Sequence, residues 1–286
     1  MNRLYATLVL ALALGLLVAG CGSSDDDTSG AAQSGATASC EPGKLPTVSD
    51  GTLTVATDKP AYPPYFEDDD PTNGEGFESA VAYAIADQLG YPAAKVKWTV
   101  EPFNSSYAPG PKDFDFDVNQ ISITPAREKA VDFSSPYYTA NQAVVVLKDS
   151  DVAKATDLEE LQDAQLGVQI GTTSLEAAEE VIEPSSRPEV FNNSTDVTTA
   201  LKNGQIDAIV VDLPTALYLT AVEIPEATVA GQFSAPGGDE WGALMAKDSP
   251  LTDCVSQAVE ELESSGELEE ITTKWMSQAA GAPVLE

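Results

Sequence analysis

The chain of 286 residues contains no histidine. This absence excludes Ser-His-Asp and Cys-His catalysis, and it excludes metal sites that need imidazole ligands. An enzyme of this composition would have to use carboxylates or lysines.

Positive charge is also scarce. The chain has 14 lysines and arginines against 46 aspartates and glutamates, which gives a formal net charge of −32. Nucleic acid is excluded as a partner because this charge repels phosphates. After Arg3, only Arg127 and Arg187 carry a guanidinium group. So rare a cation suggests a specific role for Arg127; the alternative is a surface ion pair with Glu128 or Asp132.

A long apolar run lies at the N-terminus, from about Leu8 to Ala19. It is shorter than the roughly 18 to 20 residues of a membrane span and indicates a secretory signal. The residues before Cys21 resemble a bacterial lipobox, so we predict a signal peptide at 1–20 and lipid on the Cys21 thiol. The alternative is an ordinary signal peptide with an incidental cysteine. Residues 21–39 have little to bury and predict a flexible tether.

Cysteine is limited to Cys21, Cys40 and Cys254. In an exported protein, the last two are candidates for a disulfide, although the sequence alone does not show that they meet. The predicted location is extracytoplasmic, with attachment to the cell membrane through the lipid anchor only.

Strand and helix patterns alternate along the rest of the chain, which predicts an α/β protein with mainly parallel sheets. About 245 residues remain after the tether, enough for two lobes. The predicted strands are 53–57, 95–100, 114–121, 143–147, 166–169, 190, 208–211 and 242–246, and the predicted helices are 77–89, 158–164, 174–182, 197–202, 213–221, 251–262 and 268–276.

Arg127 occupies a position suited to anion binding. The run 114–123 alternates as a half-buried strand does, after which Thr124 offers an N-cap oxygen and Pro125 a first helical residue. Arg127 would then lie in the first turn of a short helix. Its planar guanidinium can bind a carboxylate through two hydrogen bonds.

The segment Ser122-Ile-Thr-Pro-Ala-Arg127, followed by Val131-Asp-Phe-Ser-Ser-Pro-Tyr-Tyr138, resembles the signature of the extracellular solute-binding proteins of family 3, which serve polar-amino-acid ABC transporters. The resemblance extends from Leu53 to about Trp275. It implies a two-lobed, type II-like periplasmic-binding-protein fold with a two-segment hinge and a central cleft. Lobe 1 would comprise 40–141 plus 240–286, and lobe 2 would comprise 142–239.

The resemblance also implies roles for individual residues. Arg127 would hold the ligand's α-carboxylate from one lobe, and Asp212 would pair with the α-ammonium group from the other, so that binding closes the hinge. Thr173 and Ser122 would add contacts to the carboxylate. From the residues alone, Thr173 begins a candidate capping box with Glu176, and Asp212 is a candidate helix cap.

The resemblance also suggests which residues would contact the ligand side chain. Tyr62 and Phe66 resemble the family's aromatic lid, with Phe103 across the cleft, although the alternative for these rings is the lobe core. Asp58 lies where several members contact the ligand side chain. Gln120 stands where many members have a small residue; it adds two donors and an acceptor. The Asn119-Gln120 pair is similar to cystine-type binders, so the sequence leans toward cystine or another long polar amino acid.

These observations predict the substrate-binding component of an amino-acid ABC importer. It would act as a monomer, capture a polar L-amino acid by hinge closure and deliver it to an ABC permease. This function implies no enzymatic activity, no metal and no cofactor. Two alternatives stay open: a ligand-sensing lipoprotein, and a dehydratase or lyase on the same fold that uses Asp58 or Glu67 at raised pKa.

Overall fold

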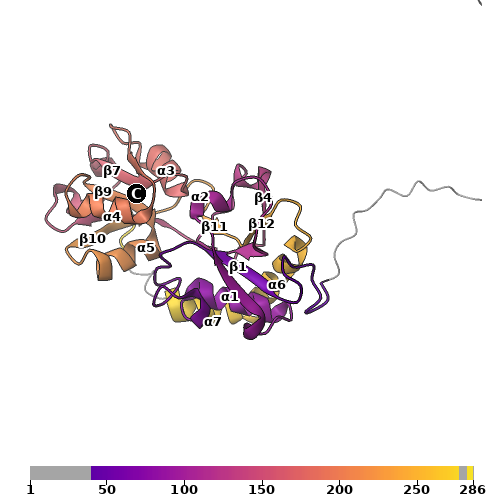
Figure 1. Ribbon diagram of the computed structural model, residues 1–286. Coiled ribbons are helices and arrows are strands. Elements are labelled where there is room, and N and C mark those ends of the chain that lie inside the picture. The colour runs from indigo at the N-terminus through magenta and orange to yellow at the C-terminus, as the bar shows by residue number, and fades with distance from the viewer. Residues whose placement is uncertain (1–39, 277–281, 286) are drawn as a thin grey trace, which may run out of the picture. The chain divides into compact units, whose positions relative to one another are not determined.

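Two five-stranded sheets organise the residues that the computed structural model describes, 40–276 and 282–285. The first sheet has the order β2-β1-β3-β12-β4 and the second has the order β10-β6-β9-β7-β8 (Figure 1). We call the sheets and their covering helices lobe 1 and lobe 2. The predicted signal peptide, tether and Cys21 lie outside the described residues. The first sheet contains β1 (Leu53–Thr57), β2 (Val96–Val100), β3 (Phe116–Asp117), β4 (Val131–Phe133) and β12 (Leu244–Ala246); the second contains β6 (Gln142–Leu147), β7 (Leu166–Gln169), β8 (Glu189–Phe191), β9 (Ala208–Asp212) and β10 (Ala227–Phe233).

The prediction of mainly parallel sheets is wrong. Each sheet has two parallel and two antiparallel pairings. In lobe 1, β12 enters from the other lobe and pairs antiparallel with β3 and β4. In lobe 2, the entering strand β6 pairs antiparallel with β9 and β10. The crossings between lobes set these directions, and local periodicity carries no information about them.

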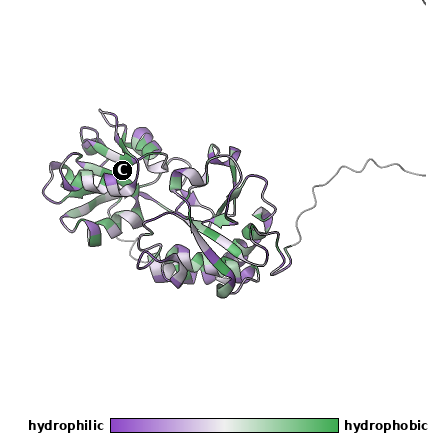
Figure 2. Ribbon diagram, in the orientation of Figure 1, coloured by the Kyte–Doolittle hydropathy of each residue, from purple (hydrophilic) through white to green (hydrophobic). Residues whose placement is uncertain are grey.

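Apolar residues line both faces of each sheet, since alternate residues of β1 and of β6 belong to separate core clusters. The strands are accordingly rich in hydrophobic residues (Figure 2). In lobe 1, α1 buries Phe77, Val81 and Ile85, and both C-terminal helices pack near it. No helix of the described ranges combines the length and hydropathy needed to cross a membrane. The helices are α1 (Phe77–Gln88), α2 (Phe103–Ser106), α3 (Thr173–Ala177), α4 (Ser194–Lys202), α5 (Leu213–Tyr218), α6 (Thr252–Ser265) and α7 (Glu267–Met276).

Several helix predictions differ in extent from the structure. The expected helix 158–164 is reduced to a 3-10 turn at Glu159–Leu161. The helices expected at 174–182 and 213–221 each begin as α-helix and continue as one wider π turn, at Ala178–Ile182 and Leu219–Glu223. Strand β10 has no counterpart among the predictions, because a glycine and polar residues interrupt its apolar pattern. Its register also shifts between Val229 and Gly231.

The chain passes between the sheets through a short ribbon. Strand β5 (Tyr138–Thr139) follows β4 of lobe 1 along the chain and leads into β6 of lobe 2. It pairs antiparallel with β11 (Glu240–Trp241), which leads back toward β12. The chain therefore passes from lobe 1 to lobe 2 through β5 and returns through β11.

A disulfide joins Cys40 to Cys254, whose Cα atoms are 5.3 Å apart. Cys254 belongs to α6 and is 1% exposed. The bridge attaches the beginning of the described chain to the core of lobe 1.

The C-terminal segment differs from the prediction that the chain after residue 240 belongs to lobe 1. Residues 282–285 lie on the edge of β10 in lobe 2: the Gln232 amide donates to the Pro283 carbonyl at 2.7 Å, and the Leu285 amide donates to the Gln232 carbonyl at 2.9 Å. The Leu285 side chain is 3% exposed within the lobe 2 core. Gly231 makes room for it, since a Cβ there would lie 2.5 Å from Leu285 Cγ.

We expect Leu285→Ala to lower the free energy of unfolding by about 2 to 5 kcal/mol, because it removes buried methyl groups and leaves a cavity. Urea unfolding followed by circular dichroism measures the change. Val284→Ala is the matched control, since Val284 is 64% exposed and pairs through its main chain. Equal effects of the two substitutions would show that Leu285 does not anchor the segment.

Candidate ligand-binding site

A cavity of about 510 Å³ is lined by residues of both lobes, within the size range of pockets for small molecules. Lobe 1 contributes the residues after β1, the start of α2 and the segment before the Arg127 turn. Lobe 2 contributes the residues around the starts of α3 and α4 and the end of β9. All nine predicted ligand-binding residues line it: Asp58, Tyr62, Phe66, Phe103, Gln120, Ser122, Arg127, Thr173 and Asp212.

Arg127 bridges the two lobes. Its Nη1 donates to the Ser122 carbonyl at 2.7 Å in lobe 1, and its Nη2 donates to the Gly171 carbonyl at 2.9 Å in lobe 2. The side chain is buried, and burial lowers the pKa of Arg127. The alternative of a surface ion pair is wrong, because Asp132 pairs instead with Lys247 at 2.8 Å.

Two aromatic rings, which also contact each other, lie beside the guanidinium group. The ring centroids of Phe103 and Tyr107 lie 5.5 and 4.8 Å from Arg127 Cζ, close enough for cation–π attraction. A Cβ at Gly171 would lie 2.2 Å from the Tyr107 hydroxyl, so this crossing point requires glycine. Sequence analysis assigns no role to Tyr107, because this residue begins a proline- and glycine-rich turn segment.

The local structure around Arg127 is a 3-10 turn at Arg127–Lys129, where the sequence predicts the first turn of a helix beginning at Pro125. The Arg127 amide does donate to Thr124 Oγ1, at 3.2 Å. Thr124 therefore caps the turn as expected, but the helix does not develop.

Thr173 faces Ser122 from the opposite lobe, with their hydroxyl oxygens 3.2 Å apart. The predicted capping box is wrong: Thr172 is the N-cap of α3, and no side chain caps the helix. The Thr173 hydroxyl instead donates to Asp239 Oδ2 at 3.1 Å. The hydroxyl is directed toward the crossing segments rather than along its own helix.

Asp212 ends β9, and its side chain makes no capping bond to α5. The alternative of a helix cap is therefore wrong. Gln142 Nε2 donates to Asp212 Oδ1 and to Asp239 Oδ2, each at 2.6 Å. Burial and the neighbouring Asp239 raise the pKa of Asp212 well above its usual range, while Arg127 opposes this rise. A cation is the natural partner for two carboxylates held this close.

A series of polar contacts links Arg127 to Asp212, the two residues proposed to hold the ligand. They lead from Arg127 through Ser122 and Thr173 to the carboxylate of Asp239, and then through Gln142 to Asp212. Sequence reasoning places Gln142 and Asp239 at the hinge and misses their polar roles. They are 97 residues apart in the chain, so no local pattern could connect them.

The aromatic residues after β1 divide into two groups. Tyr62 reaches lobe 2, where its hydroxyl lies 2.9 Å from Thr195 Oγ1 and its ring packs near Tyr218. Phe66 is 1% exposed and packs edge-on against Trp98, so it belongs mainly to the lobe 1 core, the alternative that the sequence left open.

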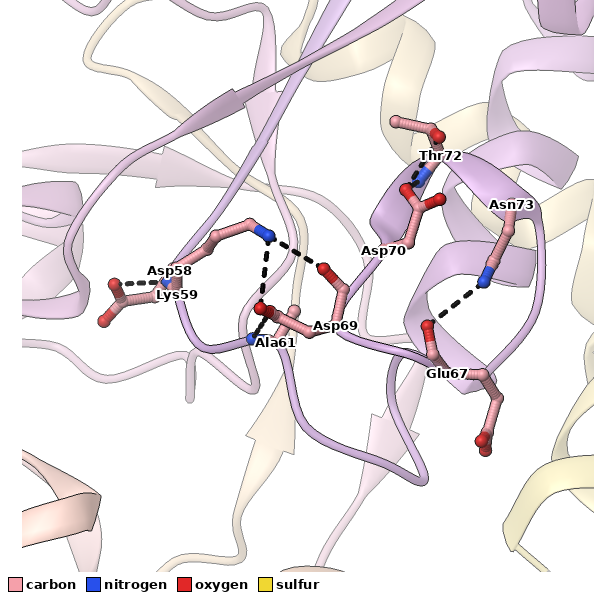
Figure 3. Close-up of polar contacts among 8 residues, drawn as sticks. All are labelled: Asp58, Lys59, Ala61, Glu67, Asp69, Asp70, Thr72 and Asn73. Atoms are coloured by element: carbon pink, nitrogen blue, oxygen red, sulfur yellow. Dashed lines mark hydrogen bonds and ion pairs between the residues drawn. The ribbon is translucent and has the colours of Figure 1, made fainter.

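Asp58 and the acidic run Asp68-Asp69-Asp70 have separate roles (Figure 3). The Asp58 carboxylate accepts hydrogen bonds from the amides of Lys59, at 2.6 Å, and Phe103, at 3.1 Å, and it lines the cavity. Asp69 pairs with Lys59 Nζ at 3.3 Å and accepts from the Ala61 amide. The acidic run therefore shapes its own loop. Among the described residues, no cluster of acidic or cysteine side chains could hold a metal ion.

Gln120 differs from its predicted role. Its backbone φ is +49°, and both its amide and its side-chain nitrogen donate to the Glu78 carboxylate. The donors that the sequence assigns to the ligand are thus directed at a buried carboxylate that sequence analysis did not single out.

The fold is that of two-lobed, amino-acid-binding periplasmic proteins. Residues 53–278 match the bacterial extracellular solute-binding proteins, family 3, and the chain belongs to that family. Membership implies an amino acid ligand, delivery to an ABC permease and an extracytoplasmic location.

Characterised relatives include the arginine-binding extracellular protein of Bacillus subtilis (strain 168), 32% identical over 74% of this chain and 82% of that protein. The L-cystine-binding protein of Escherichia coli (strain K12) is 29% identical over 79% and 82%.

Among solved structures, an ancestral arginine-binding protein bound to glutamine superposes with a TM-score of 0.66 at 31% identity, covering 78% of this chain and 97% of that one. An ancestral amino-acid-binding protein described as a precursor of cyclohexadienyl dehydratase has a TM-score of 0.62 at 31% identity, covering 78% and 94%.

Proposed function

We propose that this protein captures a polar L-amino acid between its lobes and delivers it to an ABC permease, while lipid on Cys21 holds it at the membrane. One observation carries the proposal: Arg127 of lobe 1 and Asp212 of lobe 2 line the same cavity with opposite formal charges. Arg127 would bind the α-carboxylate, supported by Ser122 and Thr173. Asp212 would bind the α-ammonium group. A ligand held by both lobes stabilises the closed hinge.

The remaining charges favour a neutral or cationic ligand side chain. The other side chains of the cavity lining that carry a formal charge are Asp58, Lys59 and Asp196. Lys59 is already paired with Asp69. Two carboxylates therefore remain after the α-groups are matched. This balance admits arginine, glutamine and cystine, and it disfavours aspartate and glutamate.

A thermal-shift screen tests the proposed function. The protein is unfolded and refolded to remove carried ligand, and then heated with each standard L-amino acid or cystine. Ligand at 100 times its dissociation constant stabilises the folded state by about 2.7 kcal/mol, or roughly 5 to 11 °C for a protein of this size. A shift with a few polar amino acids is expected. No shift with any would contradict amino acid binding.

The resemblance to a dehydratase precursor keeps one other function in view, the elimination of a group from the bound ligand. Of the two carboxylates that sequence analysis considers for this role, Glu67 does not line the cavity. Burial and the neighbouring carboxylates of Asp68 and Glu75 raise the pKa of Glu67, but this side chain lies outside the candidate ligand site. We propose binding without turnover. Mass spectrometry of the ligand after long incubation should recover it unchanged; an eliminated product would support the enzyme.

Affinity should depend on pH through Asp212. Its raised pKa means that the free protein holds a proton there at a pH where an ordinary aspartate does not. The ligand's ammonium group favours the ionised form, so binding releases that proton and strengthens as pH rises. We expect the dissociation constant to increase by up to about tenfold for each unit of pH below the pKa of Asp212.

Isothermal titration calorimetry between about pH 5 and pH 8, in two buffers of different ionisation enthalpy, measures both the affinity and the proton release. Asp212→Asn is the control. It should bind weakly and lose this part of the pH dependence, which separates Asp212 from other groups that titrate in the range. Equal pH dependence in both proteins would rule out Asp212 as its source.

A further inference from the structure

Gln120 adopts a backbone conformation that glutamine seldom takes. Its φ of +49° lies in the left-handed region, where a side chain costs roughly 1 to 2 kcal/mol relative to the right-handed form. Such residues persist only where the surroundings enforce them, and they gather at ligand sites. Gln120 is half-buried and lines the cavity.

The carboxylate of Glu78 holds Gln120 in this conformation. This carboxylate is fully buried in the first turn of α1. Its Oε1 accepts from the Gln120 amide at 2.7 Å and from the Tyr137 hydroxyl at 2.5 Å, and its Oε2 accepts from Gln120 Nε2. Gln120 is therefore fixed at both its main chain and its side chain. Burial raises the pKa of Glu78 to about 7, so at higher pH the carboxylate can only accept hydrogen bonds.

This anchoring fixes the direction of the Gln120 amide. The nitrogen must face the carboxylate, because two acceptor oxygens would repel each other, and the carbonyl oxygen faces away from it. Within residues 40–276 and 282–285, no protein donor is bonded to that oxygen. Asp58 adds a second acceptor to the same wall of the cavity from lobe 1.

We propose that Gln120, oriented by Glu78, determines specificity by presenting a hydrogen-bond acceptor to the ligand side chain. The site then selects amino acids whose side chain donates hydrogen bonds, through an amide, ammonium or guanidinium group, and rejects side-chain carboxylates. This inference rests on the proposed function. Glu78 is a positioning residue, since it acts through Gln120.

Glutamine and glutamate are nearly the same size, but the glutamine side chain donates hydrogen bonds, whereas the glutamate side chain is a negatively charged acceptor. We expect the refolded protein at about pH 8 to bind the tightest of L-glutamine, L-arginine and L-lysine at least 100-fold more strongly than L-glutamate, since a site that hydrogen-bonds a donor discriminates strongly against a ligand lacking it. Calorimetric dissociation constants for the four ligands provide the measurement.

Gln120→Gly tests the residue without threatening the fold, because glycine adopts positive φ at little cost. Relief of the positive φ is opposed by loss of the Gln120 Nε2 donor to the buried Glu78 carboxylate, so the thermal midpoint should change little. The preference for the donor ligand over glutamate should fall by about tenfold or more, the effect of about one hydrogen bond to a charged group. Glu78→Gln should reduce the same preference, because an amide no longer fixes the direction of Gln120. Tyr137→Phe is the control: it removes one bond to Glu78, leaves Gln120 untouched and should keep the preference.

The outcomes separate the two proposals. If no amino acid binds the unmodified protein, the proposed function fails, and the inference with it. If amino acids bind but glutamate binds within tenfold of the best donor ligand, the inference alone is overturned. Full retention of the preference in Gln120→Gly would overturn it equally.

Discussion

Replacing Arg127 with alanine is expected to weaken the binding of every α-amino acid by about 30- to 5,000-fold. The substitution removes the cation that would hold the ligand's carboxylate in a buried site, and loss of one partner of a buried, hydrogen-bonded charge pair costs about 2 to 5 kcal/mol. The buried position beside the rings of Phe103 and Tyr107 makes this charge hard to replace. Calorimetry on refolded protein gives the dissociation constants.

Arg187→Ala is the matched control for this result. The Arg187 side chain is 82% exposed and lies 3.7 Å from Glu179, so its loss should leave binding unchanged. Arg127→Lys should fall between wild type and Arg127→Ala, because lysine keeps the charge but not the planar pair of donors. A dissociation constant within tenfold of the wild type for a folded Arg127→Ala protein would contradict the role proposed for Arg127.

Removing the disulfide is expected to have the largest effect on stability. Cys40 and Cys254 are separated by 214 positions, and the chain-entropy model assigns a loop of this length about 5 kcal/mol. The double variant Cys40→Ala/Cys254→Ala avoids free thiols and should unfold at a much lower urea concentration. Ligand binding should persist in the folded fraction, because neither residue lines the cavity.

Reduction of the wild-type protein provides an independent comparison. Its unfolding midpoint should approach that of the double variant, whereas the reducing agent should not affect the variant. A change below about 1 kcal/mol in both experiments would show that the bridge contributes little, as happens when the reduced, unfolded chain retains structure.

Local periodicity predicts the elements that carry continuous apolar patterns. The strands β1, β6, β7 and β9 and the helices α1, α6 and α7 lie within a few residues of their expected limits. The strand expected at 114–121 is reduced to Phe116–Asp117, because only these two residues pair with β1. The return of the C-terminus to β10 depends on Leu285 filling the space above Gly231, a tertiary contact that no local pattern encodes.

In the candidate site, too, local motifs predict some residues, whereas others are defined only by tertiary contacts. Arg127 and Asp212 could be selected from motifs in one chain segment each, and the structure places both on one cavity. Gln142, Asp239 and Glu78 could not, because each is defined by a partner at least 42 residues away. Gln120 was selected for its polarity at a position usually small in the family, but its donors are directed at Glu78.

The central claim is that the two lobes bind the two α-groups of one amino acid. It is tested most directly by measuring the dissociation constants of the best ligand, of the same molecule without its carboxylate, and of the same molecule without its α-amino group. The account predicts that each deletion weakens binding by at least about 100-fold, and that Arg127→Ala lowers affinity for the carboxylate-free ligand by less than about tenfold. Similar affinities for all three ligands would contradict it.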